Sequence, residues 1–483
     1  MIRGQLWQLI DEDEMQRLDE AALRLLSRTG AVIRHDATLA RLEAAGCTVE
    51  RESGRCRFPE KLIRDVLAHF GRPQDNDSTG AANWNPALHT GHGGSFPHFL
   101  EWPDCRRRLA TRQDVADMAK MAHVLPEFGS VGQVLTCAEV DSRIEPVWNA
   151  VERMSLTDKP IGGGEVLHHE NIKHLVRLGE LETGVPGDTS LLATCNFSVA
   201  PLIFGRRMLD CAIEKAKFRC PHVPGTMPIS GISAPVTLAG TVAVCLAELI
   251  VGWVIGYLLD PDLSVGGIVA SGSLDMRTLR ACFGSPEAHL QDTATAQVCR
   301  RLYGIRVHVA LGYVDCKTPG IEATYEKLLP LVAAPFLGEG AGISPGLLSA
   351  GQDYSPVQHL LDLDMLGGWQ RFNAGLKVDD DTLALDLVDA AAHRQRPTFL
   401  DSEHTARHYA SEQWYPRWLD RQIWQGDRNE SGAERRMLDA VNDHWKDAVA
   451  RYERPELDPG KLAEAEKILA AAEAERGRVR PLV

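Results

Sequence analysis

The sequence predicts an α/β protein whose main domain is a parallel (β/α)8 barrel of the TIM type, with helical additions at both ends. Short apolar or β-branched runs that end in glycine or small polar residues alternate with helix-like stretches from residue 131 to residue 373. Seven such strand–helix units follow one another, which is typical of a parallel sheet. The composition, with 44% hydrophobic and 24% charged residues, is that of a folded protein with a large core. An open doubly wound sheet is the alternative.

Residues 1–84 are predicted to form a helical N-terminal extension. A helix is expected from Asp11 to Gly30 because Met15, Leu18, Ala22 and Leu25 share one helical stripe. Further helices are expected over 36–45 and 59–70, with a hairpin at 47–58 between them. The polar connector at 71–85 marks the boundary before the barrel.

The barrel is predicted to occupy residues 85–380, and residues 381–483 a C-terminal helical region. The expected strands are 131–137, 160–165, 190–196, 221–226, 264–272, 306–313 and 334–340, and the expected helices are 145–156, 168–182, 202–218, 236–259, 285–303, 321–333 and 357–373. The eighth strand is expected from 87–101 or from the region near Phe399. The charged helix at 459–476 is expected to form a solvated surface or an oligomer contact.

Charge and cysteine content exclude several classes of protein. The net charge of −14 disfavours general binding to nucleic acid or to anionic lipid. Eleven scattered cysteines without a CxxC pair, and an N-terminus without a secretory signal, favour a reducing cytoplasm.

The segment 236–259 is long and apolar enough to span a bilayer. No Lys or Arg lies between Arg219 and Arg277, so the basic anchors of a membrane boundary are missing. Pro235 before the segment and Asp-Pro-Asp at 260–262 after it are the start and stop signals of a soluble helix. The sequence therefore predicts a buried helix and no membrane span.

In a barrel, functional residues lie at the carboxyl ends of the strands. That rule selects a set of polar residues, each of which has an alternative role as a helix cap or turn former: Glu165, Asn196, Ser198, Thr226, Ser271, Asp275, Tyr313, Asp315 and Glu339. Glycine clusters at 91–94, 162–164 and 338–342 lack a P-loop lysine. We interpret these glycines as positions where a bulky ligand approaches the backbone.

Two histidine pairs are weak candidates for a zinc site. His404 and His408 have helical i, i+4 spacing, and His92 and His98 flank a Gly/Pro turn. Neither pair has an evident third ligand, so structural hydrogen bonding is favoured for both, and no metal is expected.

Several strings together resemble the trimethylamine methyltransferase family, the corrinoid-dependent methyltransferases of methylated amines and their quaternary-amine relatives. They follow the family's order along nearly the whole chain: 22–30 with 42–46, 233–240 with Ala247-Glu248, 274–278 with 284–287, Asp315-Cys-Lys317 with Glu322 and Tyr325-Glu326, 340–342, and Phe399-Leu400 with His404-Thr405.

The resemblance implies a TIM barrel that passes a methyl group from an amine to the cobalt of a separate corrinoid protein docked at the barrel mouth. Trimethylamine-specific members carry pyrrolysine, and this sequence contains none. The chain therefore resembles the branch that demethylates quaternary amines such as glycine betaine. Residues 393–397 depart from the family's Gly-Pro-Gly-Gly turn, and Gly320 replaces an expected acidic residue.

The chemistry of a quaternary amine agrees with this expectation. Its demethylation releases a neutral amine, so no general acid is required. A tight carboxylate contact would stabilise the cationic ground state more than the transition state, so an aromatic face such as Tyr313 or Trp253 suits the ammonium better.

We expect the substrate to be surrounded by Asn196, Tyr313, Asp315 and Glu339, with Glu165 and His92 farther out. Asn196 would orient a substrate carboxylate through its amide. The alternatives are that Asn196 caps a helix starting near Pro201 and that Tyr313 only packs the barrel.

The expected partners are a cognate corrinoid protein, or free corrinoid, a small quaternary amine and further copies of the chain. Three other functions stay open: demethylation of a sulfonium or methyl ether, a zinc-dependent TIM-barrel hydrolase, and a non-catalytic betaine-binding or scaffold protein.

Overall fold

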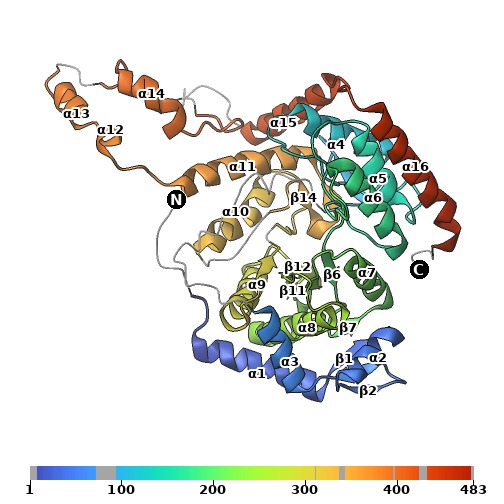
Figure 1. The fold of residues 1–483 in the computed structure, drawn as a ribbon. Helices are drawn as coiled ribbons and strands as arrows, with labels where there is room; N and C mark the ends of the chain where they lie inside the picture. Colours follow the sequence, from blue (N-terminus) through green and yellow to red (C-terminus); the bar gives the residue numbers. More distant parts are fainter. Residues whose placement is uncertain are drawn as a thin grey trace.

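The computed structural model describes residues 8–71, 94–310, 312–336, 343–394, 398–421, 423 and 432–479. Helices and short strands alternate along these residues (Figure 1), which confirms a mixed α/β fold. Two large hydrophobic cores organise it, beside a small cluster of Leu331, Ile343, Leu366 and Trp369. One draws on residues 96–192, 314–361 and 438–472, and the other on residues 15–67 and 202–309.

The N-terminal region forms α1 (Glu12–Arg28), α2 (Asp36–Ala44) and α3 (Glu60–Phe70) where helices were predicted. A capping box begins α1, because Asp11 and Glu14 each accept the other's backbone N–H, at 2.8 and 2.9 Å. The predicted hairpin is β2 (Thr48–Glu50) and β3 (Arg55–Arg57). β1 (Ala31–Ile33) pairs with β3 and, in parallel, with β7 (Ile203–Phe204), so this region is not purely helical and shares a sheet with the main domain.

A four-stranded parallel sheet lies at the centre of the strand–helix series. It contains β6 (Cys195–Phe197), β8 (Val223–Thr226), β10 (Gly267–Val269) and β13 (Val307–Val309), paired in that order. The connecting segments contain α7 (Arg206–Lys217), α8 (Leu238–Leu259) and α9 (Pro286–Val298), which a π-helical turn extends through Cys299–Tyr303. The predicted alternation is confirmed over residues 195–309.

Further pairings continue on both sides of this sheet. Isolated parallel bridges join Leu192 to Gly164, Ile161 to Val131, and Leu135 to Phe96, next to β4 (His98–Glu101). β4 pairs with β5 (Arg106–Leu109) and, in parallel, with β15 (Asp353–Tyr354), which pairs with β14 (Leu347–Leu348). The N–H groups of Ser349 and Ala350 bond the carbonyls of Cys316 and Val314, beyond β13.

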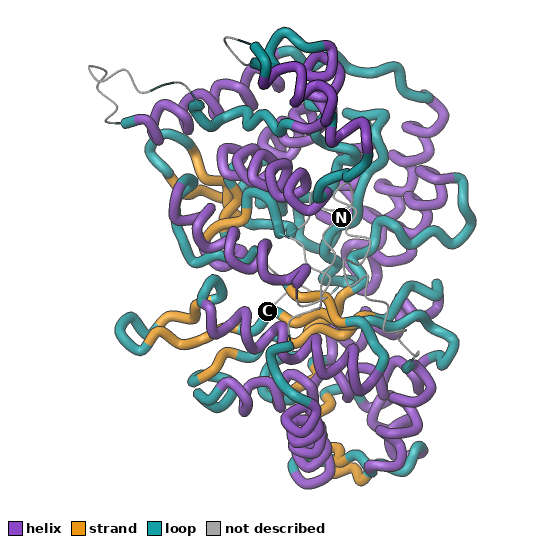
Figure 2. The backbone as a smooth tube through the Cα atoms, turned by 90° about the vertical axis from the view of Figure 1, so that its left-hand side faces the viewer, coloured by secondary structure: helices purple, strands orange, loops and turns teal. Residues whose placement is uncertain are grey.

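The described strands nevertheless form four separate sheets, not one closed sheet (Figure 2). The fourth is the small sheet of β9 (Ile229–Ser230), β11 (Gly272–Asp275) and β12 (Arg280–Cys282). β4 lies within the predicted range 87–101, whereas Phe399 forms no strand. The strand predicted at 334–340 is wrong at its start, because residues 334–336 end α10 (Ile321–Phe336); residues 337–340 lie outside the described residues.

The apolar segment 236–259 is the core helix α8, packed against α1, α3, α9 and β8. Among the described residues it is the one helix long and apolar enough to cross a membrane, and 83% of its most apolar window is buried. Trp253 on α8 is fully buried, and its indole N–H donates to the Gly266 carbonyl at 2.7 Å. Trp253 as a substrate contact is therefore wrong.

Outer helices complete the fold. They are α4 (Arg112–Val124), α5 (Glu145–Met154), α6 (Ile172–Thr183), α11 (Pro356–Ala374), α15 (Ala433–Ala450) and α16 (Pro459–Glu475), with single 3-10 turns at His169–Asn171, Ser349–Gly351 and Arg476–Arg478. The charged helix α16 packs on α5 and α6 and buries Ala465, Ile468 and Ala472. One of its faces is thus part of a core, and the other faces solvent.

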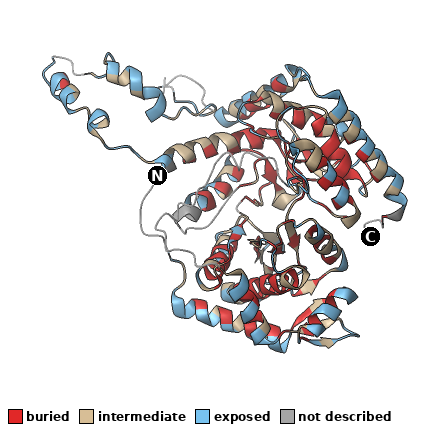
Figure 3. Ribbon diagram, in the orientation of Figure 1, coloured by how far each residue is buried: buried red, intermediate tan, exposed pale blue. Residues whose placement is uncertain are grey.

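Beyond α11, the chain leaves the body as an arm that holds α12 (Asp380–Leu383), α13 (Leu385–Ala392) and α14 (Glu403–Glu412) (Figure 1). Most of its residues are exposed (Figure 3). The chain returns at Trp414, whose ring lies against Gly367 and Gly368 of α11.

Candidate active site

The candidate site lies at the carboxyl edge of the parallel sheet, where segments that follow different strands meet. Four of the six residues predicted to surround the substrate are described: Glu165, Asn196, Tyr313 and Asp315. Glu339 and His92 lie outside the described residues.

Tyr313 follows β13 and is half-buried. Its ring lies 5.6 Å from the Phe283 ring, and a Cβ at Gly351 would come within 2.8 Å of it, so the ring is held between Phe283 and the backbone. Burial, together with the nearby Cys195 and Glu165, raises the pKa of Tyr313 to about 12. The phenol is therefore protonated at neutral pH, and its electrostatic coupling to Cys195 and Glu165 indicates that three strand ends face one region.

Glu165 has solvent-accessible surface, yet protein surrounds it closely enough that burial raises its pKa. The cations Arg207 and Lys215 oppose this rise. Such a carboxyl group is neutral over a wider pH range than an ordinary glutamate.

Asn196 at β6 is buried and makes two contacts within the protein. Its Nδ2 donates to the Thr194 carbonyl at 3.2 Å, and its Oδ1 accepts from Lys215 Nζ at 3.3 Å. The helix-cap interpretation of Asn196 is wrong, because α7 begins at Arg206 and its first turn has no side-chain cap.

Lys215 is a buried cation beneath the end of β6 that was not predicted as a site residue. Its Nζ also donates to the carbonyls of Ala193 at 2.5 Å and Cys195 at 3.4 Å. A sequence signal was available, because Leu209, Ala212 and Lys215 recur every three residues on the buried stripe of α7. A lysine on an apolar stripe needs a buried acceptor.

Asp315 holds two segments together. Its carboxylate accepts the backbone N–H groups of Phe283 at 3.0 Å and Gly284 at 2.9 Å. Since Phe283 contacts Tyr313, these bonds fix the aromatic pair. Asp315 therefore acts in the structure as a positioning residue.

Glu326 on α10 supports the same segment, and sequence reasoning did not select it as a site residue. Its carboxylate accepts the N–H groups of Asp315 at 2.6 Å and Cys316 at 3.3 Å, and burial raises its pKa. An adjoining cavity of about 590 Å³ is lined by Ile321 and by six residues from the motifs that carry the family resemblance: Asp315, Cys316, Lys317, Glu322, Tyr325 and Glu326.

Three other polar residues predicted at the strand ends bond buried carboxylates. Ser198 and Thr226 each donate to Glu248 of α8 at 2.7 Å. The Ser271 N–H donates to Asp292 of α9 at 2.8 Å, and burial raises the pKa of Asp292 to about 7. These residues stabilise the helices against the sheet.

Glycines 162–164 do not leave room for a ligand. A Cβ at Gly163 would lie 2.9 Å from the backbone of residues 190–191, and one at Gly164 would overlap the Gln133 side chain. These glycines allow protein segments to pack closely, so the ligand interpretation is wrong for this cluster.

The histidine pairs lie elsewhere. The rings of His404 and His408 on α14 lie 4.4 Å apart, tilted by 41°, and both residues contact Asp381, within the arm. His98 bonds the Gln352 carbonyl at 3.0 Å. In the part of the chain that the structure describes, no group of three or more His, Cys, Asp or Glu side chains is placed to share a metal ion.

Comparison with known proteins gives a consistent result over almost the whole chain. The family profile of trimethylamine methyltransferase (MTTB) matches residues 2–477. The glycine betaine methyltransferase of Desulfitobacterium hafniense (strain Y51) is 25% identical and aligns with 98% of this chain and 99% of its own length.

Other relatives belong to the same group. The trimethylamine methyltransferase MttB of Desulfitobacterium hafniense (strain DSM 10664 / DCB-2) is 24% identical over 98% of this chain and 95% of its own. The crystal structure of the Methanosarcina barkeri monomethylamine methyltransferase (MtmB) aligns with 91% of this chain and 89% of its own, at 11% identity and a TM-score of 0.46. On the match over residues 2–477, the chain is a methyltransferase that belongs to the trimethylamine methyltransferase family.

Proposed function

We propose that this enzyme transfers a methyl group from a small quaternary amine, such as glycine betaine, to the cobalt(I) of a corrinoid. The corrinoid is a co-substrate, carried by a cognate protein or supplied free. The observation that carries the donor class is the Tyr313 ring, which lies beside Phe283 at the strand edge and within the electrostatic range of Glu165. The likeness of the whole chain to a glycine betaine methyltransferase supports the same choice.

The electrostatics of this edge suit a reaction in which positive charge disappears. An aromatic face attracts a quaternary ammonium by roughly 0.5–2 kcal/mol, less than a desolvated carboxylate would. Because burial raises the pKa of Glu165, its carboxylate takes up a proton more readily than that of an ordinary glutamate. The site then binds the cation without a large ground-state stabilisation.

The substrate would be enclosed by Asn196, Tyr313, Asp315 and Glu339, with Glu165 and His92 farther out. The buried charge of Lys215 beside Asn196 favours placing the substrate carboxylate at that end. In our proposal the described strand ends act by positioning the donor, and the corrinoid approaches from the open side.

We also propose that the strands belong to a (β/α)8 barrel, with residues 1–84 and 381–483 as additions. Support comes from the succession of pairings, which leads from β4 through segments 131–137 and 161–164 to the β6–β8–β10–β13 sheet and returns by β15 to β4. The enzyme is expected to work in the cytoplasm, with α8 serving as a core helix.

The experiment is incubation of the purified enzyme with cob(I)alamin and a panel of betaines, carnitine, sulfonium compounds and methyl ethers, followed by methylcobalamin absorbance. We expect conversion with a quaternary amine, slower conversion by Tyr313→Ala and Asn196→Ala, and a smaller loss in Tyr313→Phe. Tyr257→Phe is a matched control. Tyr257 on α8 is half-buried against the rings of His69 and Phe70 of α3 and lies away from the strand ends.

Conversion of only a sulfonium or an ether would refute the quaternary-amine donor. Failure with every donor, both with free corrinoid and with the cognate corrinoid protein, would favour a betaine-binding or scaffold role. Wild-type rates in both alanine variants would show that the placement of the substrate is wrong.

A further inference from the structure

The arm, defined as residues 376–411, has almost no core of its own. Of its described residues, only Ala391 is buried. Eight large apolar side chains are exposed: Leu376, Val378, Leu383, Leu385, Val388, Phe399, Leu400 and Tyr409. Its three helices have 4, 8 and 10 residues, fewer than the roughly 12–15 that an isolated helix needs in water. An arm of this kind requires a covering surface.

Polar contacts hold the arm together from the inside. The Asp381 carboxylate lies 3.2 Å from Arg407 and 3.2 Å from His408, and its carbonyl lies 3.0 Å from His404 Nε2. The helices thus meet through charged and polar groups while the leucines point outward. This is the reverse of an ordinary globular element.

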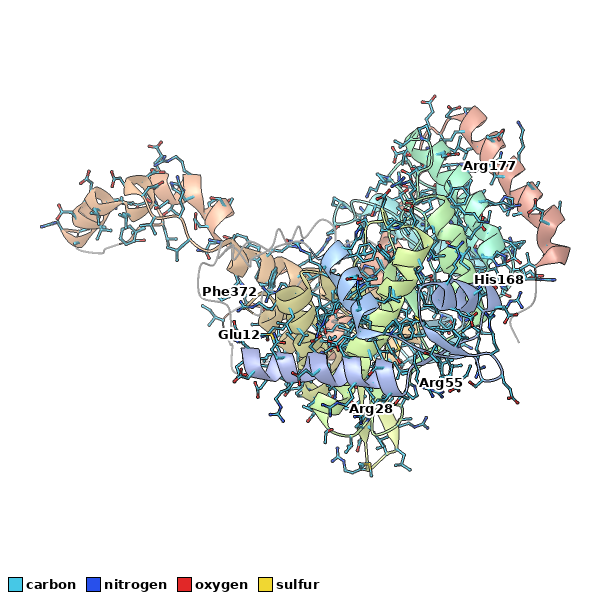
Figure 4. All side chains as sticks on the ribbon, turned by 60° about the horizontal axis from the view of Figure 1, so that its bottom comes forward. Glu12, Arg28, Arg55, His168, Arg177 and Phe372 are labelled. Atoms are coloured by element: carbon cyan, nitrogen blue, oxygen red, sulfur yellow. The ribbon has the colours of Figure 1, made fainter. Side chains whose placement is uncertain are left out.

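The base of the arm is fixed to the body. Arg371 of α11 donates to the Glu412 carboxylate at 2.9 Å and to the Gly375 carbonyl at 2.9 Å. These bonds join the segment that leaves the body to the segment that returns to it. Trp414 lies 3.0 Å from the Cβ position of Gly368, so no larger residue fits there without a shift. Phe372 projects beside this base with 63% of its surface exposed (Figure 4). The projecting direction of the arm is therefore built into the fold.

On the body, helix α10 likewise has a charged residue inside and apolar residues outside. Its Lys327 is fully buried and paired with Asp362 of α11. Its outer face carries the α10 stripe, defined as Ile321, Tyr325, Leu328, Leu329 and Val332, with Tyr325 80% exposed. These positions recur at helical spacing, so they form one continuous apolar face.

We propose that the arm of one copy packs on the α10 stripe of a second copy, and that the exchange is reciprocal. One chain carries both apolar surfaces, and both stay exposed within a single copy. At about 80 Å² for each of these thirteen side chains, an exchange buries on the order of 2,000 Å² of apolar surface over both copies, which is what a stable dimer needs. A two-fold symmetric dimer covers the arm and the α10 stripe of both copies at once.

Sedimentation velocity tests the exchange. The wild-type chain is expected to have twice the chain mass, or an even multiple of it. The arm variant Leu385→Asp/Leu400→Asp and the stripe variant Tyr325→Asp/Leu329→Asp are each expected to be monomeric. Val185→Asp, at a loop position that is 54% exposed, is the matched control and is expected to keep the wild-type mass.

Mixing the two double variants sharpens the test. Their heterodimer retains one intact contact, between the arm of the stripe variant and the stripe of the arm variant, so we expect a dimer in the mixture only. A monomeric wild-type chain, an arm variant that keeps the wild-type mass, or a mixture without heterodimer would overturn the proposal.

Hydrogen exchange of the wild-type chain provides a readout that does not depend on variants. Raising the protein concentration is expected to protect residues 321–332 and 385–409 together. Protection that does not change with concentration in either segment would refute the exchange.

Discussion

Replacing Asp315 by alanine tests how the aromatic pair at the strand ends is held in place. The carboxylate accepts two backbone N–H groups, those of Phe283 and Gly284, at 3.0 and 2.9 Å. A hydrogen bond to a charged group contributes about 1.5–3 kcal/mol, and leaving a buried donor unpaired costs a similar amount. Because all three residues are half-buried, water replaces part of the loss. We expect the free energy of unfolding to fall by about 2–3 kcal/mol.

The same substitution is expected to slow methyl transfer. Without the carboxylate, the segment at Phe283 is released and the Tyr313 ring loses its neighbour at 5.6 Å. A displacement of about 1 Å at the reacting methyl costs on the order of 100-fold in rate. Asp315→Asn keeps one acceptor oxygen, so we expect about half the loss of stability and a smaller loss of rate.

Urea unfolding and methylcobalamin formation at saturating donor measure the two effects. Asp260→Ala is the control, because the Asp260 carboxylate also accepts a backbone N–H, that of Asp262 at 2.9 Å, but in the loop that follows α8. If Asp315→Ala unfolds at the wild-type urea concentration and loses activity with one donor only, Asp315 contacts substrate and the positioning role is wrong.

Three further predictions concern buried charges. The folded pKa of Asp292 is about 7, above its unfolded value, so between the two pKa values the folded state keeps this proton while the unfolded state loses it. The contribution of Asp292 to the free energy of unfolding should therefore fall by about 4 kcal/mol between pH 4 and 7. Urea unfolding of Asp292→Asn should show a flatter pH dependence over this range. Lys327→Met leaves the buried Asp362 without its cation and should lower the free energy of unfolding by about 3–5 kcal/mol. In thermal melts, the double variant Lys327→Met/Asp362→Asn should regain most of this lost stability. Lys215→Met removes one of the two cations that lower the pKa of Glu165, so that pKa should rise. In a plot of rate against pH, the titration step of Glu165 should move to higher pH in this variant. The step should be absent in Glu165→Gln.

Local signals predicted much of the fold. The sequence predicts α1 from Asp11, its apolar stripe and Gly30, and it predicts a hairpin over 47–58, where β2 and β3 lie. Both elements depend on neighbours within a few positions. The apolar run at 334–336 was predicted as a strand but ends a helix. Periodicity cannot separate a short apolar strand from the last turn of an apolar helix.

The site was predicted less completely, since its contacts join residues that are distant in sequence. The strand-end rule selected Tyr313 and Glu165, whose coupling supports a shared space. It also selected Ser198, which donates to Glu248, 50 residues away and on a helix that looks purely apolar. Nothing near Asp315 in the sequence indicates that its carboxylate bonds the backbone at Phe283.

The packing of α8 bears on how this apolar helix is protected while the chain is being synthesised. Its neighbours α1 and α3 precede it in the chain, whereas α9 follows directly. During synthesis, the two N-terminal helices leave the ribosome before this apolar segment does, so a complementary surface is available when it emerges. We therefore expect the N-terminal region to shield the apolar segment as soon as it emerges. A chain deprived of α1 and α3 would expose that segment to aggregation or to misdirected insertion into a membrane.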